Sequence, residues 1–252
     1  MAQTVKSVQL DSRTVEAFDA YIRQAEIEME QTLHEDGSFL WSQLQPARLQ
    51  DVNRGEVAAQ FWGGQGPGKV PSGLIHDWIA AALIPDSTIR EVFAVIQDYD
   101  NHKNIYKPEV IDSKLIRRDD NDFQIYLRLL KKKIITVVLD TDHEVHYRAV
   151  DRTRWVCRSH TTRIAEVENA GRPGERILQP DTGYGFLWRL HTDWRFEECN
   201  RGVVVECRAI SLTRDMPFGL GWAIEPIIQT LPKESLIHTL MATRQALHPR
   251  AR

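Results

Sequence analysis

Six strand-like segments follow one another between residues 110 and 213, and they constrain the fold more than any other feature of the sequence. Short turn signals separate them, such as Asp-Asp-Asn-Asp at 119–122 and Asn-Arg-Gly at 200–202. Parallel strands need long crossover connections, so connections this short join antiparallel neighbours. We therefore predict an antiparallel sheet. Its strands are expected at 110–116, 123–130, 134–147, 154–167, 185–198 and 203–213.

Helical patterns flank this run of strands. After a candidate strand at 74–84, Asp86 or Ser87 is expected to cap a helix whose buried stripe includes Val92 and Ile96. A short helical turn follows at 99–106. A long helical pattern at 220–247 closes the chain, and its two prolines, Pro226 and Pro232, predict a kink or a division there. The order indicates an α+β fold with helices on one face of the sheet.

The first 73 residues add a helix and a connector to this plan. Residues 11–35 carry apolar side chains at helical spacing, and the stretch 11–36 holds eight acidic residues against Arg13 and Arg23. Residues 38–73 are irregular but rich in aromatic side chains, which is typical of a connector that packs on a domain. We expect residues 1–73 to pack against a domain formed by residues 74–252.

Composition excludes several classes of protein. The formal net charge is −3, from 32 Lys+Arg and 35 Asp+Glu, so nucleic acid is not the expected partner. The longest apolar run, 78–84, is far shorter than the roughly 20 residues of a membrane span. The start lacks the apolar segment of a signal peptide, so we expect a cytoplasmic protein. The alternative is an exported protein whose signal peptide has been removed.

Several short motifs suggest chemistry but have simpler explanations. Gly63 to Lys69 matches GxxxxGK, yet Val70 replaces the hydroxyl residue of a phosphate loop. His143 and His146 are three apart on a strand and point to opposite faces, so we expect solvated side chains and no metal. Ser159-His160 lacks a nucleophile elbow. The three cysteines (Cys157, Cys199 and Cys207) lack metal-site spacing. We assign no cofactor and no catalytic residue.

A run of three lysines, Lys131 to Lys133, lies between two apolar strands. The simpler interpretation is a solvated hairpin tip. The alternative is a weak contact with an anionic membrane, since each lysine near such a surface contributes about 1 kcal/mol.

The segment from Phe186 to Phe196 is the most informative for function. Its even-numbered residues are aromatic or apolar apart from Thr192, and its odd-numbered residues are mainly charged. A turn at 201–202 predicts the pairs Phe196–Cys207, Trp194–Ala209 and Thr192–Ser211. The opposite face then holds a ladder of Arg195, Glu197, Glu206 and Arg208, which we expect to face water. Large aromatic residues opposite small ones are typical of a packed core or of a cavity wall.

The chain resembles the START-related superfamily, also called the polyketide cyclase and lipid-transport group. The resemblance covers roughly 74–247. It rests on IAAALIPDSTIREVF at 79–93, on 98–106 followed by Pro-Glu-Val at 108–110, on GFLWRLHTDWRF at 185–196, and on the closing run 232–247. It implies a helix-grip fold, in which a curved antiparallel sheet wraps the last helix and leaves an apolar cavity.

The resemblance also implies a function. We expect non-catalytic binding or transport of a hydrophobic small molecule, such as a lipid, an isoprenoid or a polyketide-like compound. One alternative is a cyclase or dehydratase that uses the same cavity, with His160, His191 and Glu206 as the residues to examine. The other is a protein-interaction module, and the oligomeric state is left open. The expected ligand-binding residues are Phe186, Trp188, Thr192, Trp194, Ser211, Trp222 and Met241.

Overall fold

The computed structural model describes residues 7–34, 38–132, 136–215 and 221–248, with side chains for all of these except residues 34 and 221–231. Seven long strands dominate it, and each pairs antiparallel with its neighbours in one large sheet. The predicted antiparallel sheet is therefore confirmed. The long strands are β4 (Gly73–Pro85), β5 (Val110–Asp119), β6 (Asp122–Lys132), β7 (Thr136–Ala149), β8 (Arg154–Glu168), β11 (Arg189–Cys199) and β12 (Gly202–Arg214).

The order of strands across this sheet is β2-β4-β12-β11-β8-β7-β6-β5. The order brings the first long strand, β4, beside the last, β12, so the two ends of the domain meet in the sheet. Among the short strands, β3 pairs with β4 and β9 pairs with β8, while β1 and β10 form a separate small sheet. The short strands are β1 (Val8–Gln9), β2 (Ala58–Phe61), β3 (Gly68–Val70), β9 (Arg176–Ile177) and β10 (Thr182–Gly183).

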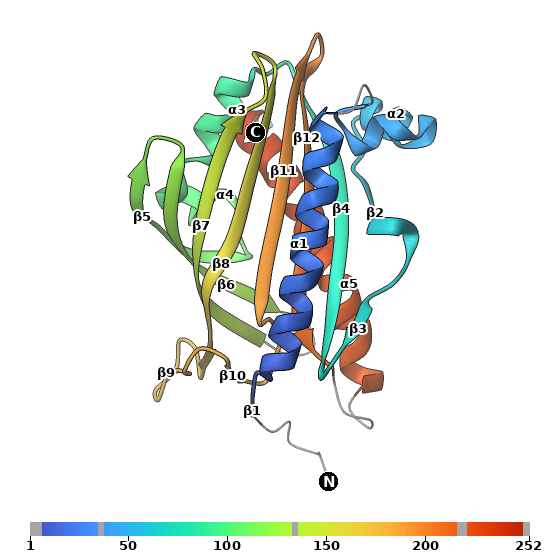
Figure 1. The fold of residues 1–252 in the computed structure, drawn as a ribbon. Coiled ribbons are helices and arrows are strands. Elements are labelled where there is room, and N and C mark those ends of the chain that lie inside the picture. The colour runs from blue at the N-terminus through green and yellow to red at the C-terminus, as the bar shows by residue number, and fades with distance from the viewer. Residues whose placement is uncertain (1–6, 35–37, 133–135, 216–220, 249–252) are drawn as a thin grey trace.

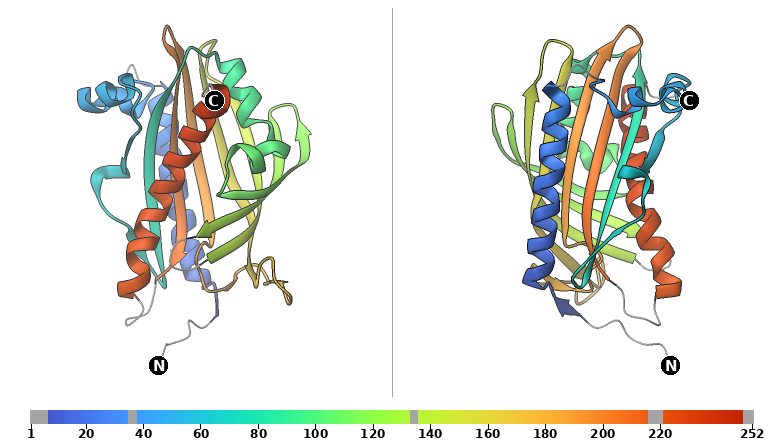
Figure 2. Two further views of the ribbon diagram at one scale, coloured as in Figure 1. Left: turned by 180° about the vertical axis from the view of Figure 1, so that it is seen from behind. Right: turned by 45° about the vertical axis from the view of Figure 1, so that its right-hand side comes forward.

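Helices lie on both faces of the sheet, so our expectation of helices on one face was wrong. Figure 1 shows α1 (Ser12–His34) crossing the front of β11, β12 and β4, while α5 (Gly221–Leu247) lies behind them. Figure 2 shows the sheet bending around α5. We call the face toward α5 the inner face and the face toward α1 the outer face. The remaining helices are α2 (Pro46–Asn53), α3 (Ile89–Ile96), α4 (His102–Ile105), η1 (Trp41–Leu44), η2 (Trp62–Gly64) and η3 (Tyr99–Asn101).

This is the helix-grip arrangement with an extra N-terminal helix, as expected. Two local expectations were wrong. The cap of α3 is Thr88, whose hydroxyl accepts from the backbone N–H of Glu91 while the Glu91 carboxylate accepts from the backbone N–H of Thr88. We expected a kink or a division in α5, and the division is wrong, because the backbone is helical without a break from 221 to 247.

The strand pairing differs from our prediction by two residues. Trp194 pairs with Cys207, Thr192 with Ala209, and Phe196 with Val205, because Gly202 joins the strand and the turn lies at 200–201. Side chains alternate with a period of two, so a shift of two residues leaves every side chain on its predicted face.

The predicted water-facing charge ladder was wrong. Arg195, Glu206 and Arg208 lie on the outer face and are buried, at 6%, 2% and 2% exposure, because α1 and the segment after it cover them. The acidic residues of α1 supply part of the charge that a buried guanidinium needs. The same cover explains the uninterrupted apolar run of β4, since a strand covered on both faces need not alternate.

Candidate functional site

A cavity of about 330 Å³ lies between the inner face of the sheet and the helical layer. The strands contribute mainly apolar side chains, and α5 closes the other side with Ser235, Leu236, His238 and Thr239. The segment from α3 to α4 adds Ile96, Tyr99, His102 and Tyr106. Representative lining residues of the sheet are Ile125, Leu127, Leu190, Trp194, Phe196 and Ala209.

Four of the seven expected ligand-binding residues line this cavity. They are Phe186, Thr192, Trp194 and Ser211. The indole N–H of Trp194 donates to the Thr192 hydroxyl over 3.0 Å, so these two side chains fix each other on the wall. The regular alternation of β11 and β12 is the signal that identified Thr192, Trp194 and Ser211.

Trp188 is a correction, because it lies on the outer face. It is 4% exposed and packs with Phe18 of α1 and with Ile210. It precedes β11 and therefore escapes the alternation of that strand. Gly185 permits the backbone path that leads to Trp188. It has a φ of +81°, and a Cβ there would lie 2.9 Å from the Trp188 ring.

Met241 is not among the residues that line the cavity. The last residue of α5 that lines the cavity is Thr239, and Met241 lies two residues beyond it. The sulfur of Met241 instead accepts from Arg244. The side chain of Trp222 lies outside the described residues.

The structure adds polar groups to the cavity that sequence reasoning missed. His143 lines the cavity and is 6% exposed, so our expectation of a solvated residue was wrong. Its Nε2 hydrogen-bonds with the Thr141 hydroxyl over 2.9 Å, and His102 Nε2 hydrogen-bonds with the Ile96 carbonyl over 3.0 Å. Burial lowers the pKa of both histidines to about 4, so both rings are neutral at pH 7.

Tyrosines on the helical side are also paired. The Tyr99 and Tyr147 hydroxyls hydrogen-bond over 2.9 Å, and the Tyr106 hydroxyl hydrogen-bonds with that of Thr243 over 3.1 Å. Burial raises the pKa of Tyr106 to about 12. The first bond joins the sheet to η3 and the second joins the end of α4 to α5.

One residue of the lysine run belongs to the wall of the cavity. Lys131 lines it, and its ammonium contacts the Glu109 carboxylate and the Ser235 hydroxyl. Lys131 is therefore a paired side chain and not a solvated hairpin tip, although burial lowers its pKa. Lys132 is exposed, and Lys133 lies outside the described residues.

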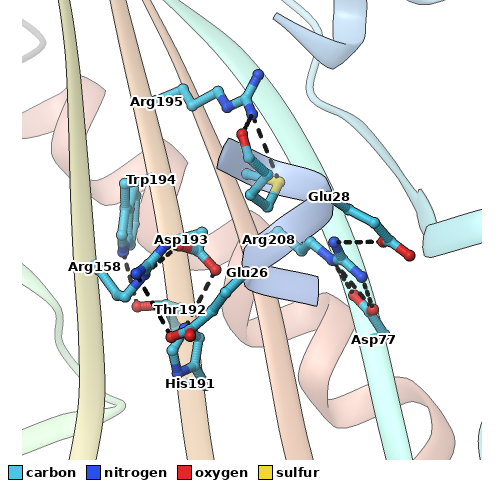
Figure 3. Close-up of polar contacts among 11 residues, drawn as sticks. Glu26, Glu28, Asp77, Arg158, His191, Thr192, Asp193, Trp194, Arg195 and Arg208 are labelled. Atoms are coloured by element: carbon cyan, nitrogen blue, oxygen red, sulfur yellow. Dashed lines mark hydrogen bonds and ion pairs between the residues drawn. The ribbon is translucent and has the colours of Figure 1, made fainter. Parts of the chain in front are cut away.

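The outer face carries a different chemistry, which Figure 3 shows beneath α1. The Arg208 guanidinium donates to Asp77 at 2.6 Å and contacts Glu28 of α1 at 3.4 Å. Arg158 donates to Asp193 over 3.1 Å, and Asp193 lies 3.3 Å from His191. The contact between Arg208 and Glu28 joins α1 to the sheet, whereas the other contacts lie within the sheet, and all of them are on the outer face.

We named three residues as possible acids or bases of an enzyme: His160, His191 and Glu206. All three lie on the outer face. Glu206 is buried and accepts from the backbone N–H groups of Trp41 and Ser42, at 2.8 and 2.7 Å. His191 is buried beside Asp193, and His160 is exposed near Glu144. None of the three lines the cavity.

A wider hollow of about 500 Å³ lies beside α1 on the outer face. Its lining includes Arg117, Arg148, Asp119 and Glu144, so both signs of charge are interleaved. A surface with both signs of charge favours neither anionic nor cationic ligands.

The described residues show neither a metal-binding group nor a membrane-spanning helix. They contain no group of three or more His, Cys, Asp or Glu side chains placed to hold a metal ion. None of the helices, over the same residues, is long and apolar enough to cross a membrane.

Comparisons with known proteins found likeness in structure alone. No protein-family model matches the chain, and no curated protein matches its sequence. A STAR-related lipid transfer protein from Xanthomonas axonopodis is 16% identical, with a TM-score of 0.47 over 73% of this chain and 99% of that one. A START superfamily protein from Mycobacterium smegmatis is 9% identical, with a TM-score of 0.46 over 70% and 99%. An aromatase/cyclase from a Streptomyces species is 11% identical, with a TM-score of 0.42 over 71% and 95%.

Proposed function

We propose that this protein binds and carries an apolar small molecule in the cavity between the inner face of the sheet and α5. The observation that supports it is the cavity itself, about 330 Å³ in volume and walled mainly by aliphatic and aromatic side chains. Small-molecule sites are typically pockets of about 300–1,000 Å³ with apolar walls and few polar groups.

The electrostatics of the cavity favour an uncharged cargo. His102 and His143 are neutral at pH 7, and the ammonium of Lys131 is already neutralised by Glu109. Moving an ionised group from water into such surroundings without a partner is costly. A lipid, isoprenoid or polyketide-like molecule meets this requirement through its uncharged body.

A cyclase or dehydratase in the same cavity is the alternative. It needs a general acid or base that touches the ligand, with a pKa near the working pH. His143 is the histidine on the sheet wall, and its pKa of about 4 makes it a weak base at pH 7. Burial lowers the pKa of His102 in the same way, which favours carriage without turnover, and His238 is the lining histidine that such an enzyme would use.

Titration with the neutral fluorescent probe N-phenyl-1-naphthylamine tests the proposal. The wild-type protein should bind the probe with a rise in fluorescence. Ala209→Trp should abolish binding, because Ala209 lines the cavity and an indole there fills it. Ile111→Trp places the same ring on an exposed position of β5 and should leave binding unchanged. Equal binding by the Ala209→Trp variant would overturn the proposal.

We also propose a weak contact with anionic membranes near the end of β6. Of the described lysines there, Lys132 is the exposed one, because Lys131 pairs with Glu109. Binding to phosphatidylserine vesicles should fall as salt rises, since screening acts over about 10 Å at 0.1 M. Binding that is unchanged in Lys132→Glu would overturn this contact.

A further inference from the structure

Three polar side chains form a compact group on the inner face, where β12 pairs with β4. Ser211 and Thr213 of β12 line the cavity, and His76 of β4 lies directly across from Ser211. All three are buried, with exposures of 5%, 4% and 0%. Directly opposite residues on antiparallel strands have Cβ atoms about 4.5–5.5 Å apart.

The hydrogen bonds within this group are incomplete. His76 Nε2 hydrogen-bonds with the Thr213 hydroxyl over 3.0 Å. The other ring nitrogen, Nδ1, has no partner, and neither does the Ser211 hydroxyl. Buried polar atoms without partners are uncommon in native proteins and destabilise them, so two adjacent ones call for an explanation.

The group carries no net charge. Burial lowers the pKa of His76 to about 4, so the ring is neutral at pH 7. A carboxylate or phosphate of a ligand would find no cation within this group, and an ammonium would find no anion. A hydroxyl can both donate and accept, and it satisfies Ser211 whichever tautomer His76 adopts.

We propose that the cargo of the cavity carries an uncharged hydroxyl group. This hydroxyl hydrogen-bonds with the Ser211 hydroxyl, opposite His76. This inference rests on the proposed function and narrows its ligand class to an apolar alcohol. The remainder of the molecule lies against the apolar walls, between the sheet and α5.

Displacement of N-phenyl-1-naphthylamine by 1-decanol and by undecane tests the hydroxyl contact, because the two chains have the same number of heavy atoms. Ser211→Ala should weaken the binding of 1-decanol about two- to tenfold, the usual effect of one lost neutral hydrogen bond. The binding of undecane should stay the same. Decanoate should bind the wild-type protein more weakly than 1-decanol at pH 7.

Two control variants locate the effect. Ser159→Ala removes a hydroxyl from another wall of the same cavity and should leave the ratio of the two affinities unchanged. His238→Phe removes a second cavity-lining side chain that has an unpaired buried polar atom, and it should also leave the ratio of the two affinities unchanged. A loss of 1-decanol affinity confined to His238→Phe would place the hydroxyl on α5 and overturn the proposal.

Stability provides an independent measurement. Ser211→Ala removes an unpaired buried hydroxyl, so its thermal midpoint should equal or exceed that of the wild type, which also shows that the variant folds. If Ser211→Ala weakens both ligands equally, or neither, the pair holds no ligand hydroxyl and the proposal is overturned. If the wild-type protein binds neither 1-decanol nor undecane, both this proposal and the proposed function are overturned.

Discussion

Arg208 shows at the scale of one residue what sequence reasoning missed. Alternation placed it correctly on the outer face, but a charged side chain on a strand is normally solvated, and we expected water there. Its partners Asp77 and Glu28 are 131 and 180 residues away in the sequence. No local pattern reveals such distant partners. The face on which Arg208 lies could therefore be predicted, whereas the burial of its side chain could not.

Removing one partner of this buried pair should be costly. Arg208→Met leaves the Asp77 carboxylate buried with the Tyr21 hydroxyl as its remaining donor, and it should lower the free energy of unfolding by about 3–5 kcal/mol. The double variant Arg208→Met with Asp77→Leu should recover most of that loss. Urea denaturation of the wild type, the single variants Arg208→Met and Asp77→Leu, and the double variant checks this, and strictly additive losses would contradict a coupled pair.

Buried histidines should make stability fall in mild acid. His76, His102 and His143 have a folded-state pKa of about 4 against an ordinary value of 6.5. Between these values the unfolded chain binds more protons than the folded one, so the free energy of unfolding decreases as the pH falls from 6.5 toward 4. His143→Gln should reduce that decrease by about 2 kcal/mol at pH 4.5. Identical pH dependence in the two proteins would contradict the buried, neutral ring.

At the scale of elements, α1 was predicted from its own residues, whereas its docking face was not. The apolar stripe identified the helix and its buried side correctly, and Phe18, Ala25 and Met29 are buried. The surface that receives it combines Trp188 with Ile210 and Ile75 from two strands. Strand pairing over long sequence separations creates that surface, so the local period of the helix carries no information about it.

The apolar stripe should contribute more to the docking of α1 than its exposed residues do. Phe18→Ala should cost about 3–5 kcal/mol of unfolding free energy, because a 4%-exposed ring leaves a cavity in the core. Ile27→Ala, on the same helix at 50% exposure, should change it by less than about 0.5 kcal/mol. Equal effects in urea denaturation would show that α1 does not dock through this stripe.

For the whole molecule, the order of strands and helices was enough to predict the antiparallel sheet and the helical layer on its inner face, but not the cover of the outer face by α1. The cavity is different, because its volume depends on how far the sheet bends from α5 and on which side chains fill the gap. The predicted pairs Phe196–Cys207 and Trp194–Ala209 indicated large side chains opposite small ones, a pattern shared by packed cores and cavity walls. The helical contribution, including His102 and Tyr106, had no sequence signal that linked it to the sheet.

Native mass spectrometry of the purified protein tests the central claim most directly. The account predicts a species heavier than the 29.1 kDa chain by the mass of an apolar molecule, which organic solvent extracts. Ala209→Trp, purified in the same way, should give the bare chain. A wild-type protein that shows only the mass of the bare chain, both as purified and after incubation with N-phenyl-1-naphthylamine, would contradict the claim that the cavity carries a ligand.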